Sequence, residues 1–520
     1  MNEVALKQPR RILPRWRLFA TTARLGELNP KEAKNIQPIK FDDGSALIQR
    51  WKEERLPGIA AEVLAHAVFS KDRALALEAA MFLERHRDRN MSRTPLDMLV
   101  LATTRKDGLP LEDPWLIQIY QAEERSIREL RQGLRMFPHN AIAWAELALL
   151  HARNGAKEKA SRCMKVAVSL APDDRFVIRS AVRCFSHLRD PEIGLHIINR
   201  TARTKEDPWL LSAQIALTQS LDKPQRLMRN ANHMIESGRY SSWDLSELNA
   251  AVGSLLHHDN VHKKANKHFR ASLLQPTENA LCQVIFDQKS PAFHDLTQSI
   301  HPPRNFESET RTFYSDLEIE KACDSAKSWL SDEPFSARPA LFGSFVASVA
   351  LEDYEQSLMF LEDGLTPNPN SSLLLNNKAL SLARLGRTDE AEESLRKARE
   401  NARGEEQTDT ILTATDGLIH FRKGEAIQGR EKYEAAIAQA RKGGRISQEA
   451  MALVFLAREE FDARTEVADQ AIKRAEESVK RVVNNNLDTR IAMARLLMAV
   501  EKRKEDSGDT SAASSTGETS

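Results

Sequence analysis

The sequence has little of several residue types, and each shortage excludes a class of protein. Four cysteines among 520 residues are too few for a disulfide-stapled scaffold and favour a reducing compartment, so we expect a cytoplasmic protein. The 20 glycines and 21 prolines are far fewer than low-complexity or collagen-like chains carry. No apolar run approaches the roughly 18 residues that a membrane span needs, and the N-terminus lacks the apolar segment of a secretory signal. We therefore expect no membrane partner.

Sequence motifs for common catalytic chemistry are missing as well. There is no GxxxxGK[ST] or GxGxxG loop to cradle phosphates, no HExxH zinc site, no GxSxG serine elbow and no CxxC pair. The cysteines are scattered along the chain, and a small buried thiol is their default role. We therefore expect a non-enzymatic chain with no catalytic residue, metal or cofactor. An enzyme with appended helical repeats remains an alternative.

The charges are unevenly distributed although the formal net charge is only +1. Residues 301–520 hold 30 Lys and Arg against 39 Asp and Glu, a net charge of −9, which leaves +10 for residues 1–300. Such an asymmetry acts on association rather than on the fold. The two halves are therefore either ordinary solvated helical surfaces or surfaces that attract partners of opposite charge.

The first 24 residues concentrate the basic excess. They hold six Lys and Arg residues against Glu3 alone, and Trp16, Leu18 and Phe19 give the segment an apolar side. Pro9 and Pro14 argue against one continuous helix. Three interpretations remain open: an arm that packs on the first helices, a docking segment for a protein or anionic surface, or an organelle-targeting peptide.

What the chain does contain is a repeated helical pattern. From residue 141, apolar and small residues recur at fixed positions of a 34-residue unit. The residues at these positions are Trp144, Leu147, Ala148, His151, Gly155, Ala160, Met164, Ala167 and Pro172. Small residues at positions 8, 20 and 27 let two paired helices approach, and glycine at position 15 can adopt a positive φ in a turn. With these residues the unit resembles the tetratricopeptide repeat (TPR), a helix–turn–helix.

Further copies start near residues 175, 246, 338, 372 and 410. The copy at 372 is the second clear match, with Gly386 at position 15, and the copy at 410 has Gly417, Gly424 and Gly429 at positions 8, 15 and 20. The resemblance implies an all-α fold, a right-handed α-solenoid whose units are stabilised by stacking on their neighbours.

The periodicity divides the chain into seven parts. Three prolines interrupt the repeats at 286–310, which suggests a joint between two arrays, and small polar residues at the C-terminus predict disorder. The expected parts are a basic arm (1–24), an N-terminal helical region (25–104) with two helices joined at 70–73, a first TPR-like array (105–285), the joint (286–310), a second array (311–440), a C-terminal helical cap (441–503) and a disordered tail (504–520).

The resemblance also implies where a partner binds. In TPR proteins the first helix of each repeat lines a concave groove, and the register carries that role to Arg153, Arg179 and Arg183 in the first array. The corresponding residues of the second array are Asn376, Asn377, Arg384 and Arg422. Arginine forks suit carboxylates, and asparagine amides suit a peptide backbone; the alternative is that these side chains are merely solvated. We expect charge reversal at Arg179 and Arg183 to leave folding intact.

A histidine-rich segment is the one candidate metal site. His258 and His262 are spaced to share one face of a helix, and His257, Asp259 and His268 lie nearby. The repeat register instead places Asp259 at a turn, and three neighbouring lysines repel a cation. We therefore expect no metal site here, but either an anion-binding basic surface or an ordinary solvated turn.

Together these observations predict a protein-interaction scaffold or a regulatory, sensor-type subunit of a multi-protein complex, which binds segments of partner proteins in its grooves. The alternative is a nucleic-acid-associated repeat protein that uses the basic N-terminal half, with steep salt dependence.

Overall fold

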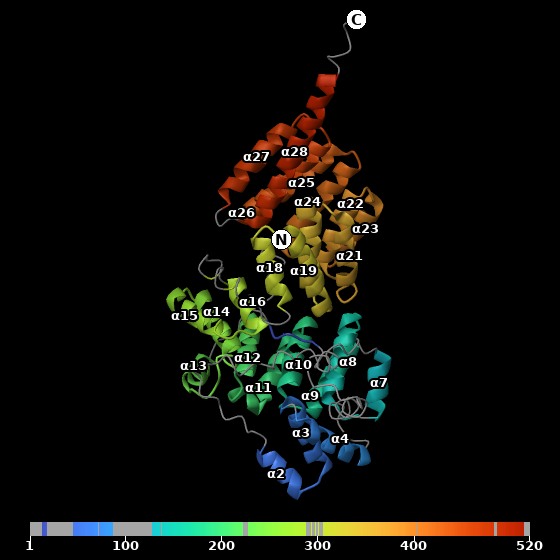
Figure 1. Cartoon of the computed structure of the whole chain (residues 1–520). Helices are drawn as coiled ribbons and strands as arrows, with labels where there is room; N and C mark the ends of the chain where they lie inside the picture. The colour runs from blue at the N-terminus through green and yellow to red at the C-terminus, as the bar shows by residue number, and fades with distance from the viewer. Residues whose placement is uncertain are drawn as a thin grey trace. The chain divides into compact units, whose positions relative to one another are not determined.

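The computed structural model describes residues 13–17, 45–70, 72–86, 127–136, 138–221, 227–287, 293, 297, 300, 305–402, 404–482 and 486–513. Every regular element in these ranges is helical, which confirms the all-α prediction (Figure 1). The chain divides into two compact units, one over Arg11–Asn305 and the other mainly over Phe306–Ser520. The division falls inside the 286–310 segment, between the last helix of the first unit and the first helix of the second.

The first unit is a series of helix pairs preceded by a small helical group. In each pair the first helix also packs on the first helix of the next pair, as stacked repeats require. The helices are α2 (Ser45–Glu53), α3 (Pro57–Ser70), α4 (Arg73–Arg85), α7 (Ile127–Met136), α8 (Ala141–Arg153), α9 (Lys157–Leu170), α10 (Arg175–His187), α11 (Pro191–Arg200), the short 3₁₀ helix η1 (Ala202–Lys205), α12 (Pro208–Ser220), α13 (Met228–Glu236), α14 (Ser246–His258), α15 (His262–Ser272) and α16 (Glu278–Asp287).

The second unit repeats the same arrangement around one continuous apolar core that runs from Tyr314 to Leu496. Its helices are α18 (Phe306–Ser315), α19 (Ile319–Asp332), α20 (Ala337–Phe345), the π-helical turn η2 (Val346–Leu351), α21 (Tyr354–Leu365), α22 (Ser372–Arg384), α23 (Thr388–Glu400), α24 (Glu406–Arg422), α25 (Ala426–Lys442), α26 (Ile446–Asp462), α27 (Ala468–Arg481) and α28 (Leu487–Ala513).

Side-chain caps start the first helices of several repeats. Asn140 accepts a hydrogen bond from the Ala143 amide at the start of α8, and Asp174 accepts one from the Val177 amide at the start of α10. Asp207 does the same for α12. Each cap satisfies an amide that has no partner within its own helix, and is typically worth about 1 kcal/mol. The α8 and α10 starts, at 141 and 175, therefore lie one 34-residue unit apart, as the sequence predicts.

In six of the repeats, the turn between the two helices holds a residue with positive φ at position 15 of the unit. This left-handed conformation reverses the chain between the two helices and is unstrained only for glycine. The residues with φ between 57° and 84° at this position are Gly155, Arg189, Asn260, Glu352, Gly386 and Gly424. The predicted turn position is thus confirmed, and several repeats fill it with a residue other than glycine.

The predicted close approach of paired helices is clearest between α24 and α25. A Cβ atom added to Gly417 would lie 2.8 Å from the carbonyl oxygen of Gly429, and one added to Gly429 would lie 2.9 Å from the carbonyl oxygen of Gly417. Neither distance leaves room for a methyl group. The two glycines stand at positions 8 and 20, where the sequence pattern requires small residues.

The C-terminal part differs from the expected boundaries. Helices α26 and α27 form a further helix pair within 441–503, so the pairs continue past residue 440. The pattern is hidden there because Arg464, with φ of 54°, occupies the turn in place of glycine. Helix α28 runs on to Ala513, beyond the boundary expected at 504. In the part of the chain that the structure describes, no helix has the length and apolar character needed to cross a membrane.

Candidate functional site

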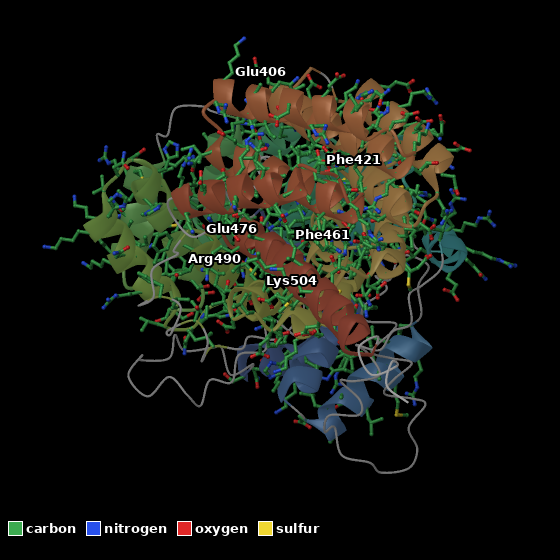
Figure 2. All side chains as sticks on the ribbon, turned by 90° about the horizontal axis from the view of Figure 1, so that it is seen from above. Glu406, Phe421, Phe461, Glu476, Arg490 and Lys504 are labelled. Carbon is green, nitrogen blue, oxygen red and sulfur yellow. The ribbon has the colours of Figure 1, made fainter. Side chains whose placement is uncertain are left out.

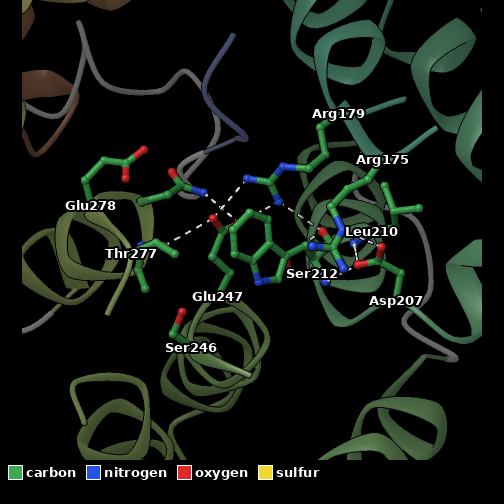
Figure 3. Close-up of polar contacts among 12 residues, drawn as sticks. Arg175, Arg179, Asp207, Leu210, Ser212, Ser246, Glu247, Thr277 and Glu278 are labelled. Carbon is green, nitrogen blue, oxygen red and sulfur yellow. Dashed lines mark hydrogen bonds and ion pairs between the residues drawn. The ribbon is translucent and has the colours of Figure 1, made fainter. Parts of the chain in front are cut away.

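Arg179, expected to face a partner in the first array, lies in a buried ion pair. Its two terminal nitrogens donate hydrogen bonds of 2.8 and 2.9 Å to the two carboxylate oxygens of Glu247 on α14 (Figure 3). The guanidinium also lies 4.9 Å from the centre of the Trp209 ring. The side chains of Arg179 and Glu247 are only 11% and 5% exposed. The fork geometry is the one expected for arginine, but its carboxylate belongs to this chain.

Glu247 receives further hydrogen bonds beside the start of α16. The Thr277 hydroxyl and the Asn279 amide each donate to its carboxylate at 3.2 Å. The Arg175 guanidinium lies 5.0 Å from the centre of the Trp209 ring and pairs with Asp207 at 2.6 Å (Figure 3). These polar contacts join α10, α12, α14 and α16, the first helices of four successive repeats.

The basic arm is described over residues 13–17, where it packs against these same helices. Leu13 lies in an apolar cluster with residues of α10, α11 and α12. Trp16 is 1% exposed. Arg17 donates a hydrogen bond of 2.9 Å to Glu278, and Arg15 donates one of 3.2 Å to the Cys282 sulfur, one helical turn further along α16. For these five residues, the structure supports the interpretation of an arm that packs on the fold.

Pro14 lies over a strip of small side chains. The space left beside it is only about 20 Å³ and is lined by Ser212, Ala213 and Ala216 of α12, by Glu247, Ala250 and Ala251 of α14, and by Asn279, Ala280 and Gln283 of α16. Small residues of three first helices thus line the space beside Pro14.

Arg153 and Arg183, the other two predicted arginines, are half-buried and take part in interactions of their own. Arg183 stands one turn before His187 on α10. Burial lowers the pKa of His187 to about 3, and the charge of Arg183 lowers it further. A partner-binding role for Arg153 and Arg183 stays a prediction.

The second unit contains a partly open cavity of about 170 Å³. It is bounded mainly by first helices (α20 with η2, α22, α24 and α26) and by α28; Figure 2 marks α24 by Glu406 and Phe421, and α28 by Arg490 and Lys504. A cavity of about 150 Å³ accommodates a benzene ring, so this one is large enough for one big apolar side chain. Its apolar walls are formed by Leu341, Phe345, Val349, Leu373, Leu380, Ile411, Ala414, Leu418, Met451, Val454 and Phe455.

Three of the four residues predicted in the second array line this cavity: Asn376, Asn377 and Arg384. Asn376 is 2% exposed, and its side-chain oxygen has no hydrogen-bonding partner among the residues that the structure describes. The Asn377 amide nitrogen donates to the Ser344 hydroxyl at 3.2 Å. The three residues thus lie together at one cavity, and their role in binding stays a prediction.

Gln448 and Arg495 add polar groups that the sequence analysis did not identify. Both polar atoms of the Gln448 side-chain amide are buried and lack a hydrogen-bonding partner in the described ranges. Arg495 is half-buried on α28, lines the same cavity, and forms no ion pair with any residue that the structure describes. Both lie in the segment expected to be a cap, which explains why they were missed.

Arg384 and Arg422 belong to a buried ionic cluster beside the cavity. Arg384 lies 2.5 Å from Glu459 and 2.9 Å from Asp462, and Arg422 lies 2.8 and 2.9 Å from the same two carboxylates. Burial opposes the charge of Asp462, but Arg384 and Arg458 bring its pKa below the usual range. At Glu459, burial outweighs the opposing charges of Arg384 and Arg422 and raises the pKa. The two predicted arginines are thus held by internal carboxylates.

The histidine-rich segment forms no metal site among the residues described here. Helix α14 ends at His258 and α15 begins at His262, so the two histidines do not share one helix. The His257 and His262 rings approach to 3.3 Å through their Nδ1 atoms. Within the described ranges, no group of three or more His, Cys, Asp or Glu side chains is arranged to hold a metal ion.

The missed carboxylates of the first groove had a partial signal in the sequence. Glu247 stands at position 2 of its unit, one of the positions that face the groove in TPR proteins. Its pairing with Arg179 connects helices two repeats apart, which no local pattern reveals. The sequence of the arm shows only a basic and apolar composition, which does not reveal the helices that it contacts.

Comparison with known proteins finds no matching family model and no matching curated protein. Three solved structures share 12–13% identity with the chain. The APC/C hetero-tetramer Cut9–Hcn1 matches with a TM-score of 0.42 over 87% of this chain and 92% of the other. Yeast Tom70 matches with 0.32 over 90% and 100%, and Naa15/Naa10 bound to HypK-THB with 0.21 over 86% and 91%. The helix pairs and the position-15 turns described above are those of a TPR-like α-solenoid.

Proposed function

We propose that the chain is a non-enzymatic interaction scaffold whose second unit binds a segment of a partner protein. The observation that supports this most directly is the cavity between α20, α22, α24, α26 and α28, which combines apolar walls with unpartnered polar atoms. A buried amide without a hydrogen bond is unfavourable by about 1–3 kcal/mol. A ligand that satisfies these atoms recovers that free energy on binding.

The lining defines the chemistry of the partner segment. The volume of about 170 Å³ is suited to one large apolar side chain as an anchor. The Asn376 oxygen accepts a hydrogen bond and the Gln448 amide both donates and accepts, so these groups are suited to the peptide groups of the segment's backbone. Arg495 favours a carboxylate beside the anchor. The expected ligand is therefore a peptide in which a Leu, Phe or Met is adjacent to Asp or Glu.

The test starts from the purified full-length chain. Peptides selected from a random phage-displayed library are expected to share the anchor and the acidic residue. Ala414→Phe fills the cavity from α24, and we expect it to weaken the selected peptides at least tenfold. Ala438→Phe is the matched control, because Ala438 is exposed on the outer helix α25. Arg495→Glu should discriminate against acidic peptides by about tenfold, or roughly 1.4 kcal/mol.

Two outcomes contradict this proposal. One is a selection that yields no peptide above background. The other is a set of peptides that bind Ala414→Phe as tightly as the unmodified chain. Affinity purification from the native cell, with and without nuclease, addresses the alternative: partners that disappear with nuclease treatment favour binding of nucleic acid, whereas a stoichiometric protein that remains supports the scaffold.

A further inference from the structure

The first unit has a groove that already holds a peptide segment, and that segment is the chain's own residues 13–17. The five residues have no helical structure, and they contact α10, α12, α14 and α16 through side chains rather than by extending a helix. A segment without helical structure that packs across several first helices is the arrangement expected of a bound partner peptide.

The contacts specify the sequence of the occupant. Arg17 pairs with Glu278 at 2.9 Å, with only 3% and 5% of the two side chains exposed, so a neutral or acidic residue at this place would leave a carboxylate buried without its counter-charge. Trp16 is 1% exposed and provides the largest apolar group of the segment. Pro14 fixes φ and so reduces the entropy lost when the segment is ordered.

The groove itself is acidic where it meets the arm. The second carboxylate oxygen of Glu278 is buried and, within the part of the chain that the structure describes, has no hydrogen-bonding partner. Burial raises the pKa of Glu278, and Arg17 and Arg15 oppose that change. Glu247 is neutralised within the fold by Arg179, which leaves Glu278 as the carboxylate that pairs with the arm.

We propose that the groove of α10, α12, α14 and α16 is a recognition site for an extended segment in which tryptophan is followed by arginine, and that Leu13–Arg17 of the same chain is its resident occupant. The arm then closes this site to partner segments of the same chemistry until one displaces it. The proposal concerns the first unit and is independent of the cavity in the second.

The test compares the full-length chain with its Trp16→Ala/Arg17→Ala variant. The probe is a fluorescently labelled peptide that spans residues 9–24, and its binding is followed by anisotropy. We expect the variant to bind the peptide at least tenfold more tightly than the unmodified chain, whose groove is filled. A probe peptide with the same two alanines is the control and should bind neither protein. Adding Glu278→Gln to the variant should weaken the unmodified probe at least tenfold.

Several results would overturn the proposal. They are equal affinity of the probe for both proteins, or no binding by a folded variant. If the variant fails to fold, the probe peptide should restore its folded circular dichroism signal, and failure to do so counts against the proposal. Light scattering should show the unmodified chain as a monomer at the assay concentration; a dimer that dissociates when the peptide is added would instead assign the arm to a second copy.

Discussion

Arg179 and Glu247 are 68 residues apart in the sequence and meet through two hydrogen bonds of 2.8 and 2.9 Å. Because the pair joins α10 to α14, it connects repeats that are not sequence neighbours. The arginine expected on the groove surface is therefore part of the interior, and the expectation that its charge could be reversed without harm to folding needs correction.

We now expect Arg179→Glu to destabilise the chain by about 3–5 kcal/mol, because it leaves Glu247 buried beside a second negative charge. Urea unfolding followed by circular dichroism measures the change. Arg200→Glu is the control, since Arg200 is exposed on the outer helix α11 and its reversal should change stability by under about 0.5 kcal/mol. Equal stability of the two variants would show that the ion pair contributes little.

The turns at position 15 predict opposite effects for two matched substitutions. Gly386 has φ of 78°, and Gly386→Ala should destabilise the chain by about 1 kcal/mol. Leu317 has φ of 64° in the corresponding turn between α18 and α19 and its side chain is exposed. Leu317→Gly should therefore stabilise the chain by up to about 1 kcal/mol. Thermal unfolding of the two variants measures these changes. A lower melting temperature for Leu317→Gly would show that the backbone at Leu317 is not strained.

The contact between α24 and α25 makes Gly417 intolerant of even one methyl group. In Gly417→Ala the new Cβ would lie 2.8 Å from a backbone oxygen, so the helices must separate, at a cost of about 1–3 kcal/mol. Thr413→Ala is the control, because it also introduces alanine on α24, at a half-buried side chain, but adds no atom at the contact with α25. Denaturant unfolding should show a large loss for the first variant and a small change for the second.

His187 makes the stability of the first unit depend on pH. Burial, aided by Arg183, lowers its pKa from 6.5 to about 3 in the folded state, so between these values the unfolded chain binds a proton that the folded chain does not. The contribution of neutral, buried His187 to the free energy of unfolding is fully present above pH 6.5 and is lost as the pH falls toward 3. One such group changes the unfolding free energy by at most about 1.4 kcal/mol per pH unit. His187→Gln should flatten this slope between pH 6 and 4; an unchanged slope would assign the dependence to other groups.

The sequence was sufficient to predict the repeats but not their polar contacts. Gly386, Gly417 and Gly424 mark positions that backbone geometry restricts, so a single sequence reveals them. Arg464 hides a repeat because it occupies a turn that glycine usually fills. The register assigns Arg179 to the groove face of its helix, but it does not say whether such an arginine meets solvent, a ligand or an internal carboxylate. Here the partner is Glu247, two repeats away.

The cavity of the second unit also contains residues that the repeat register predicts and residues that it does not. Asn376 and Asn377 were identified from their register alone, because first helices line the groove in any TPR-like solenoid. Gln448 and Arg495 come from α26 and α28, where the repeat pattern is weak. Which side chains converge on one cavity depends on how successive helices stack, and that information is tertiary.

The arm also has a mechanical consequence. The curvature of a solenoid is the sum of the small rotations between successive repeats, so it depends on every repeat interface. Leu13 contacts α10 and α12, and Arg17 contacts α16. The five residues of the arm therefore cross three successive repeat interfaces, α10–α12, α12–α14 and α14–α16. We therefore expect the repeats from α10 to α16 to change curvature less readily with the arm bound than with the arm withdrawn.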